Sequence, residues 1–168
     1  MHIVVFSDSH GSFHVLRRVV ECQPNAEAFL HLGDGERDVD DLRALYPEKR
    51  IHFVAGNCDL GSLAREEEIL TFAGKRIFLT HGHLYEVKDE PKKIAEAGKK
   101  LGADIICFGH THTPFASFVD GVYLLNPGAI SAPRGGGRSY GLIDITQAGI
   151  VLNIAEIKGD GGWTSCQT

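Results

Sequence analysis

Two histidines one residue apart make the sequence Gly-His-Thr-His at 109–112 a candidate for metal chemistry. They directly follow the largely apolar run 104–108, which is typical of a buried strand ending in a turn. Imidazole is the commonest metal-binding side chain near neutral pH. His110 and His112 could therefore bind one metal ion each or hold one ion between them. The pair is weak on its own, because two ordinary loop histidines would give the same pattern.

Four other apolar runs are also followed by side chains that bind metals. The complete set of candidate metal ligands is Asp8, His10, Asp34, Asn57, His81, His110 and His112. A mixture of carboxylate, amide and imidazole donors suits Mn, Fe, Ni or Zn, and contains too much imidazole for Mg or Ca alone. The donors are too many for one ion and fit two ions if Asp34, which lies between two glycines, bridges them. The sequence therefore predicts a centre for two divalent cations.

Such a centre would attract phosphate although the chain has a net charge of -5. Two divalent cations outweigh the carboxylates of Asp8 and Asp34 even when a bridging hydroxide is counted. Paired cations lower the pKa of a bridging water and hold a phosphoryl group for in-line attack. The predicted chemistry is hydrolysis of a phosphate ester.

The elements that must position these donors follow from the apolar pattern. Residues 2–7, 27–32 and 50–55 are interpreted as strands. An amphipathic helix after Ser12 and another ended by Pro47 separate them, which predicts a parallel β-α-β-α-β unit. Ligands of such sheets bind beyond the carboxyl ends of the strands, where the candidate donors lie.

The second half is interpreted as a hairpin, a helix and more strands. The hairpin turns at Ala73-Gly74, the helix covers 89–101, and a strand leads into the histidine pair. From Phe115 onward the pattern is rich in strands, which are interpreted as antiparallel members of a second sheet. The strand-like segments are 115–119, 122–126, 139–145 and 150–157. We expect a single domain over 1–168, with 159–168 as a flexible tail.

Composition narrows the functional classes. The chain has 168 residues with 43% hydrophobic and 23% charged residues, which is ordinary for a globular protein. Its acidic balance argues against an extended nucleic-acid surface, and its apolar runs are too short to span a membrane. The cysteines are expected to be reduced thiols in a cytoplasmic protein, because they form no close pair: Cys22, Cys58, Cys107 and Cys166. A homo-oligomer is compatible with all of these features.

Taken in order, the motifs resemble those of calcineurin-like metallophosphoesterases, and most closely the small YfcE-type phosphodiesterases. The resemblance covers about residues 1–135. The matching motifs are D-x-H at 8–10, G-D at 33–34, G-N-x-D at 56–59, H-G-H at 81–83 and G-H-x-H at 109–112. The family implies an α/β fold, a four-layer αββα sandwich of two mixed β-sheets flanked by helices. It also implies a metal-dependent phosphodiesterase whose nucleophile is a hydroxide bridging two divalent metals, with Mn²⁺ favoured over Ni²⁺, Fe²⁺, Co²⁺ or Zn²⁺.

The resemblance also assigns the ligands. It places one metal on Asp8, His10, Asp34 and His112, and the other on Asp34, Asn57, His81 and His110. This chain departs from the broader family at Cys58, where a histidine usually protonates the leaving group. A thiol of ordinary pKa is a poor substitute, so we interpret Cys58 as inert packing near the metals. His83 could stand in, and Asp59 is a second catalytic candidate that more often serves a turn.

Substrate and rival functions stay open at this stage. A small anionic phosphodiester is favoured over a monoester because no cluster of arginines awaits a dianion. A cyclic nucleotide, a nucleic-acid end and a small diester all fit, and selectivity is expected in loops 58–65, 83–90 and 128–138. Arg134, beside the glycines at 135–137, is a candidate phosphate contact, although a mobile glycine loop is the favoured interpretation. The rival function is a non-catalytic protein-interaction scaffold of the same fold, resembling the retromer subunit, and the complete ligand set argues against it.

Overall fold

The computed structural model describes residues 1–87, 91–131, 133–134 and 137–158. Within them it contains two five-stranded sheets. The first sheet has the order β10-β9-β1-β2-β3, with strands β10 (Gly149–Ile157), β9 (Arg138–Thr146), β1 (His2–Phe6), β2 (Ala28–His31) and β3 (Ile51–Phe53). The second has the order β4-β5-β6-β8-β7, with strands β4 (Glu67–Phe72), β5 (Lys75–Thr80), β6 (Ile105–Cys107), β8 (Val122–Asn126) and β7 (Phe115–Val119).

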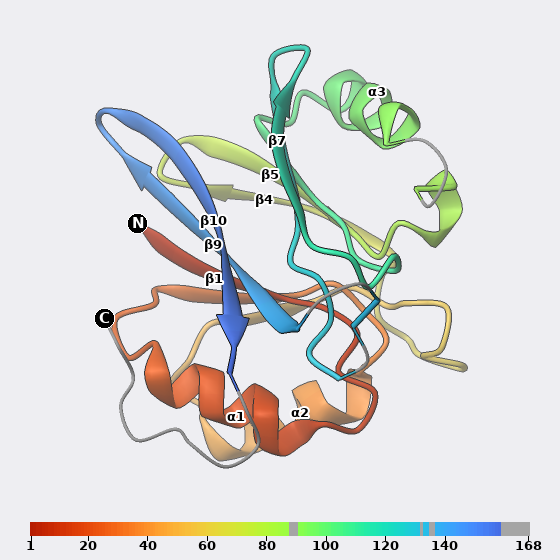
Figure 1. The fold of residues 1–168 in the computed structure, drawn as a ribbon, viewed down its shortest axis with the longest axis vertical. Coiled ribbons are helices and arrows are strands. Elements are labelled where there is room, and N and C mark those ends of the chain that lie inside the picture. The colour runs from red at the N-terminus through yellow and green to blue at the C-terminus, as the bar shows by residue number, and fades with distance from the viewer. Residues whose placement is uncertain (88–90, 132, 135–136, 159–168) are drawn as a thin grey trace.

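The sheets and helices stack in four layers (Figure 1). Helices α1 (Phe13–Cys22) and α2 (Glu36–Leu45) cover the outer face of the first sheet. Helix α3 (Lys92–Lys100) lies against the outer face of the second sheet, and a short 3-10 helix, η1 (His83–Tyr85), precedes it. The αββα sandwich predicted from the sequence is confirmed.

Apolar clusters on both faces of each sheet hold these layers together. The cluster between the sheets includes Ile3 and Leu30 from the first sheet and Leu79 and Ile105 from the second. A second cluster joins the first sheet to α1 and α2, and a third joins the second sheet to α3. Burial of these side chains removes apolar surface from water, which is the main favourable contribution to folding. The rims of the sheets lie outside these apolar clusters and can carry polar side chains.

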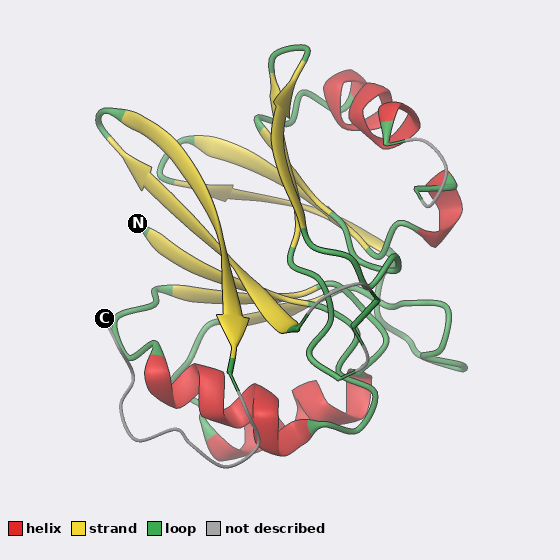
Figure 2. Cartoon of the chain, viewed as in Figure 1, coloured by secondary structure: helices red, strands yellow, loops and turns green. Residues whose placement is uncertain are grey.

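Strands β9 and β10 belong to the first sheet, so the expectation that every strand after Phe115 joins the second sheet is wrong. Strand β9 pairs antiparallel with β1, with Ile3 opposite Ile143. The physical reason is that β9 is apolar on both faces, which suits an interior strand. Ile143 packs in the cluster between the sheets, whereas Leu142 packs in the cluster under α1. Figure 2 shows β9 and β10 as a long ribbon pair at the edge of this sheet.

The other local predictions agree with the structure in most respects. The hairpin of β4 and β5 turns at Ala73 and Gly74, and α3 lies within the predicted range 89–101. Val39 and Leu42 of α2 are buried, whereas Leu45 at its C-terminal end is 48% exposed. No helix in the described part of the chain is long and apolar enough to span a membrane.

The cysteines depart from expectation at one position. Cys58 and Cys107 are free thiols. Cys22 is disulfide-bonded, so the expectation of reduced thiols throughout the chain is wrong for this residue. Cys166 lies outside the described residues. Wide spacing in the sequence carries no information about which cysteines meet in space, and the expectation rested on that spacing.

Candidate metal centre

The carboxyl ends of the central strands meet at one rim of the sandwich. Strands β1, β2 and β3 run parallel, as do β5 and β6. Each of these strands therefore delivers the residues that follow it to the same end of its sheet. The two rims touch directly, because the His110 N–H donates to Oδ2 of Asp8 at 3.2 Å and Nδ1 of His81 lies 2.6 Å from the carbonyl oxygen of Leu32.

The backbone at this rim is unusual. Eight non-glycine residues have positive φ in the part of the chain that the structure describes, and five of them are predicted metal ligands: Asp8, His10, Asp34, His110 and His112. Residues with a side chain rarely adopt this left-handed backbone conformation, which costs on the order of 1–3 kcal/mol per residue. Such strain persists only where the surrounding structure enforces it, and it is typical of functional sites.

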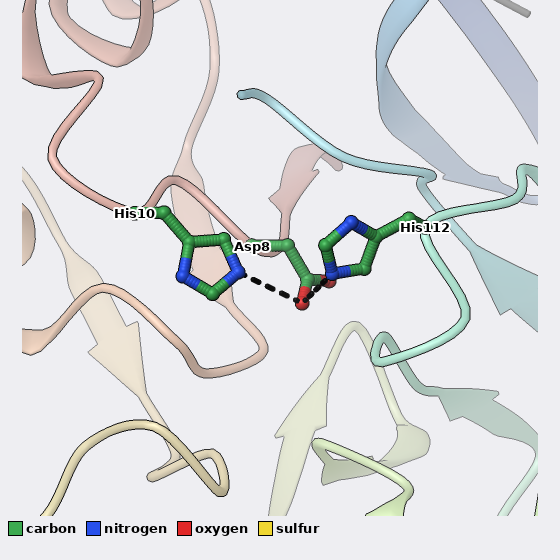
Figure 3. Close-up of side chains that lie close together, drawn as sticks. All are labelled: Asp8, His10 and His112. Atoms are coloured by element: carbon green, nitrogen blue, oxygen red, sulfur yellow. Dashed lines mark ion pairs between the residues drawn. The ribbon is translucent and has the colours of Figure 1, made fainter. Parts of the chain in front are cut away.

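Asp8 lies at the middle of the centre and is completely buried. Its Oδ2 accepts hydrogen bonds from the Ser7 hydroxyl at 2.5 Å and from the His110 N–H at 3.2 Å. Its Oδ1 has no hydrogen-bond partner. This oxygen instead faces imidazole nitrogens, with Nε2 of His112 at 3.0 Å and Nε2 of His10 at 3.8 Å. Figure 3 shows the two rings approaching Asp8 from opposite sides.

His81 is held with one ring nitrogen free for a metal. Its Nδ1 lies 2.6 Å from the carbonyl oxygen of Leu32, which requires this nitrogen to carry the proton. Its Nε2 therefore presents a lone pair in the neutral ring, 3.1 Å from Oδ1 of Asn57 and 3.5 Å from Oδ2 of Asp34. Burial acts to lower the pKa of His81, but the carboxylates of Asp34 and Asp8 outweigh burial and raise it. This surplus of negative charge favours a cation.

Asp34 links the two halves of the centre. Its Oδ2 is 3.8 Å from Nε2 of His10 and 3.5 Å from Nε2 of His81, so it can reach an ion on either side. Its Oδ1 accepts the Cys58 N–H at 2.7 Å. Burial acts to raise the pKa of Asp34, but hydrogen bonds from His81 and from Cys58 hold it well below its usual range. A Cβ at Gly56 would come within 2.1 Å of Oδ1, so only glycine fits beside this carboxylate.

The remaining predicted ligands are close to this cluster. The His110 ring lies 5.1 Å from the His81 ring, between centroids. The His112 ring lies 5.5 Å from the His10 ring. All seven predicted ligands are thus gathered at one place. The donor atoms of Asp8, His10 and His112 lie within 4.8 Å of one another, as do those of Asp8, Asp34 and His81. These carboxylate and imidazole donors, around a buried oxygen that lacks a hydrogen bond, fit the binding of divalent cations.

Asp59 has a different position from that expected of an acid or base. Its two oxygens accept four backbone N–H groups, from Asp34 at 2.7 Å, Gly35 at 2.9 Å, Glu36 at 2.9 Å and Gly56 at 2.8 Å. These bonds fasten the turn that carries Asp34 and the start of α2 to the turn that carries Asn57. The carboxylate is engaged with the chain itself, which indicates a positioning role.

Three buried polar residues support the ligands and were missed in the sequence. The Ser9 hydroxyl donates to Oδ2 of Asp38 at 2.5 Å, and the Gly11 N–H donates to the same oxygen at 2.9 Å. Asn126 donates to the carbonyl oxygen of Gly109 at 2.9 Å and so holds the turn of the histidine pair. Asp38 is an acidic residue in the first turn of a helix, where such residues are common, so its position did not indicate a role in the site. Asn126 could have been found, because it is a polar residue at the end of an apolar strand, as the predicted ligands are.

A polar cavity of about 590 Å³ opens beside the centre. It lies between the loop at 55–66 and His83. Nε2 of His83 is 3.7 Å from a carboxylate oxygen of Glu66, and its Nδ1 is buried without a hydrogen-bond partner. The His83 ring is 5.5 Å from the His81 ring, so His83 stands between the ligands and the cavity. The loop at 58–65, expected to govern selectivity, lines this cavity in part.

Comparison with known proteins identifies the family. Residues 1–148 match the profile of the calcineurin-like phosphoesterase superfamily domain. The chain belongs to this superfamily. Phosphodiesterase YfcE of Escherichia coli K12 is 31% identical over 169 residues, which cover 86% of this chain and 88% of YfcE. The resemblance seen in the sequence motifs is confirmed.

Solved structures agree. An uncharacterized Streptococcus pneumoniae protein, described as a predicted phosphoesterase, has a TM-score of 0.80 and 30% identity, with coverage of 92% of this chain and 88% of that one. Vps29 of Entamoeba histolytica, solved as a complex with zinc, has a TM-score of 0.72 and 23% identity, with coverage of 93% and 99%. The second similarity shows the fold alone.

Cys58 and Arg134 were also singled out in the sequence, although neither was predicted to bind a metal. Cys58 is exposed at the edge of the centre, and its hydrogen bond with Asp34, followed by burial, raises the pKa of the thiol to about 11. A thiol with this pKa is a weak proton donor at neutral pH, as expected. Arg134 is exposed, and its N–H donates to the carbonyl oxygen of His112 at 3.0 Å. The neighbouring positions 135–136 lie outside the described residues.

Proposed function

We propose that this protein is a metal-dependent phosphodiesterase that acts on small anionic diesters. The observation that carries the proposal is the unpaired, fully buried Oδ1 of Asp8, directed at the imidazoles of His10 and His112. A buried carboxylate oxygen without a hydrogen bond is costly, and a cation among these donors would supply the missing interaction. Two divalent cations, when bound, would lower the pKa of a water and offset the charge on phosphoryl oxygens.

The chain supplies the geometry for this reaction. Asp8, His10 and His112 would hold one ion, and Asn57, His81 and His110 the other, with Asp34 between them. The His81 tautomer set by Leu32 keeps its Nε2 available as a donor. The hydrogen bonds to Oδ2 of Asp8 fix the direction of the free Oδ1. Positions are therefore set before substrate arrives, and preorganised sites of this kind stabilise developing charge with little reorganisation.

The cavity beside the centre would hold the leaving group of the ester. Its lining residues, all within the described chain, include Asp59 and Glu66 but neither lysine nor arginine. A dianionic monoester would find no additional positive side chain here, whereas a monoanionic diester needs none. This lining favours the diesterase over the monoesterase.

His83 is our proposed proton donor to the leaving group. It lies between the ligands and the cavity, and Glu66 at 3.7 Å would orient its ring. His83→Asn should slow substrates with poor leaving groups while changing activated nitrophenyl esters little. Equal losses on both kinds of ester would contradict this role.

The test of the main proposal uses protein stripped of metal and reloaded with Mn²⁺. Hydrolysis of bis(p-nitrophenyl) phosphate is compared with that of p-nitrophenyl phosphate, with Asp8→Asn as the inactive control. We expect Mn²⁺-dependent turnover of the diester above that of the monoester, lost in the control. A faster monoester would refute the diesterase assignment.

A second candidate function is a protein-interaction scaffold with the same fold. The observation that favours it is a pair of apolar side chains on the loop beside the centre, where Leu60 is 92% exposed and Leu63 is also fully exposed. Absence of turnover with each of Mn²⁺, Ni²⁺, Co²⁺ and Zn²⁺ would favour this scaffold over the enzyme.

A further inference from the structure

The thiol of Cys58 lies within the donor set of the centre and is not merely near it. The candidate ligand atoms of Cys58, His10 and Asp34 all lie within 4.8 Å of one another. The Cys58 N–H is bonded to Oδ1 of Asp34 at 2.7 Å, which fixes the residue next to the carboxylate. Cys58 is a free cysteine with an exposed side chain, so an ion can approach it from solvent.

A second observation points to a cation at the same place. Oδ1 of Asp8 belongs to a completely buried residue and has no hydrogen-bond partner. Nε2 of His10 lies 3.8 Å from this oxygen and 3.8 Å from Oδ2 of Asp34. Nε2 of His10, a member of the thiol group, is thus near both the buried Asp8 oxygen and the Asp34 carboxylate, two negative groups whose charge a cation would offset. The thiol extends this arrangement toward solvent.

Sulfur changes which ions such a group prefers. Thiolate ligands favour soft or borderline ions such as Zn²⁺ and Cd²⁺, whereas Mn²⁺ favours oxygen donors. We propose that Cys58, together with His10 and Asp34, forms a site for a thiophilic divalent ion at the solvent side of the centre. The thiol proton passes to solvent as the metal–sulfur bond forms. The proposal rests on the metal-dependent function above and adds a sulfur donor to the nitrogen and oxygen donors described there.

Occupation of this site would oppose catalysis by Mn²⁺. An ion held by Cys58 uses His10 and Asp34, which the proposed reaction needs for its own cations. It would also fill the solvent side, where substrate must enter. We therefore expect Zn²⁺ or Cd²⁺ to inhibit the Mn²⁺-loaded protein, and Cys58→Ser to relieve this inhibition.

The test follows the metal–sulfur bond directly. Metal-free protein is titrated with Co²⁺ and with Cd²⁺, and the ultraviolet band produced by charge transfer from thiolate to metal is recorded for each ion. We expect the band in the wild type and its loss in Cys58→Ser. Cys107 is completely buried within β6, so it provides the matched control, and Cys107→Ala should retain the band. A band that persists in Cys58→Ser, or is absent from the wild type, would overturn the proposal.

Affinities give a second readout that does not depend on absorbance. Calorimetric titration should show Cd²⁺ binding weakened by at least about 10–100-fold in Cys58→Ser, because that is already the range for losing a group that only supports a ligand, with Mn²⁺ binding little changed. Equal changes for both ions would show general damage to the centre and would count against the sulfur ligand. Cd²⁺ should also protect Cys58 from alkylation by iodoacetamide, and unchanged alkylation would contradict the proposal.

Failure of this inference is distinguishable from failure of the proposed function. Mn²⁺-dependent diester hydrolysis without a charge-transfer band would leave the enzyme in place and refute the sulfur ligand. A band without any diester hydrolysis would support the sulfur ligand and refute the diesterase.

Discussion

Replacing Asp59 with asparagine tests whether this residue positions the metal ligands or takes part in chemistry. Each carboxylate oxygen accepts two backbone N–H groups, at distances between 2.7 and 2.9 Å. Asparagine has nearly the same shape but replaces one oxygen with an N–H donor. In either orientation of the amide, two backbone N–H groups would lose their acceptor.

The magnitude follows from these bonds. A hydrogen bond to a charged group contributes about 1.5–3 kcal/mol, so losing two gives about 3–6 kcal/mol if they were additive. Asp59 is only partly buried, and water can reach part of the turn, so we expect the lower end, about 3 kcal/mol. The loosened turns carry Asp34 and Asn57, so metal affinity should fall about 10–100-fold, as for other groups that support metal ligands.

Two measurements separate the possible roles. Urea denaturation of the metal-free protein gives the free energy of unfolding, and calorimetry gives the Mn²⁺ affinity. Asp41→Asn is the matched control, because Asp41 is exposed on α2 and should change neither quantity. A variant Asp59→Asn with unchanged stability and metal affinity but reduced kcat would refute the positioning role and restore Asp59 as a catalytic candidate.

Two further predictions use single substitutions near the centre. Gly56→Ala places a Cβ within 2.1 Å of Oδ1 of Asp34, so calorimetry should show weaker Mn²⁺ binding, whereas Gly137→Ala, in open space, should bind Mn²⁺ normally. Burial lowers the pKa of His31 to about 3. In the unfolded chain the His31 imidazole therefore becomes protonated near pH 6.5, whereas in the folded chain it stays neutral. The free energy of unfolding falls as the pH drops from about 7 toward 3. This residue alone should cost about 2 kcal/mol at pH 5 relative to pH 7. His31→Asn should flatten the pH dependence of urea denaturation over this range, and an unchanged slope would contradict the burial argument.

Much of the centre could be anticipated because its signals are local. Asp8 and His81 each directly follow an apolar run, and the rule that ligands bind at the carboxyl ends of parallel strands brings such residues together. The family resemblance then divided the ligands between two ions. No local pattern, however, shows that the Ser9 hydroxyl would bond to Asp38, because that contact depends on how α2 packs against the first turn.

The sheet assignment of β9 shows a second limit. Its apolar residues correctly indicated a strand, but the choice of partner depends on which buried strand still has an unpaired edge in the assembled fold. The free edge belonged to β1, and no residue near Ile143 in the sequence specifies β1 as the partner of β9. The disulfide at Cys22 has the same origin, because long-range pairing is a property of the assembled fold.

The metal centre lies across the junction of the two sheets, which has a consequence for the mechanical integrity of the molecule. Asp8 and Asp34 follow strands of the first sheet, whereas His81 and His112 follow strands of the second. An ion held by both sets would add a bond between halves that are otherwise joined here by hydrogen bonds, such as that from the His110 N–H to Asp8, and by apolar packing. Separating the halves would then require the ion to leave, so the supply of metal in the surroundings would set how readily the sandwich opens. Proteolytic resistance and amide exchange at this rim would report ion occupancy even in the absence of any substrate.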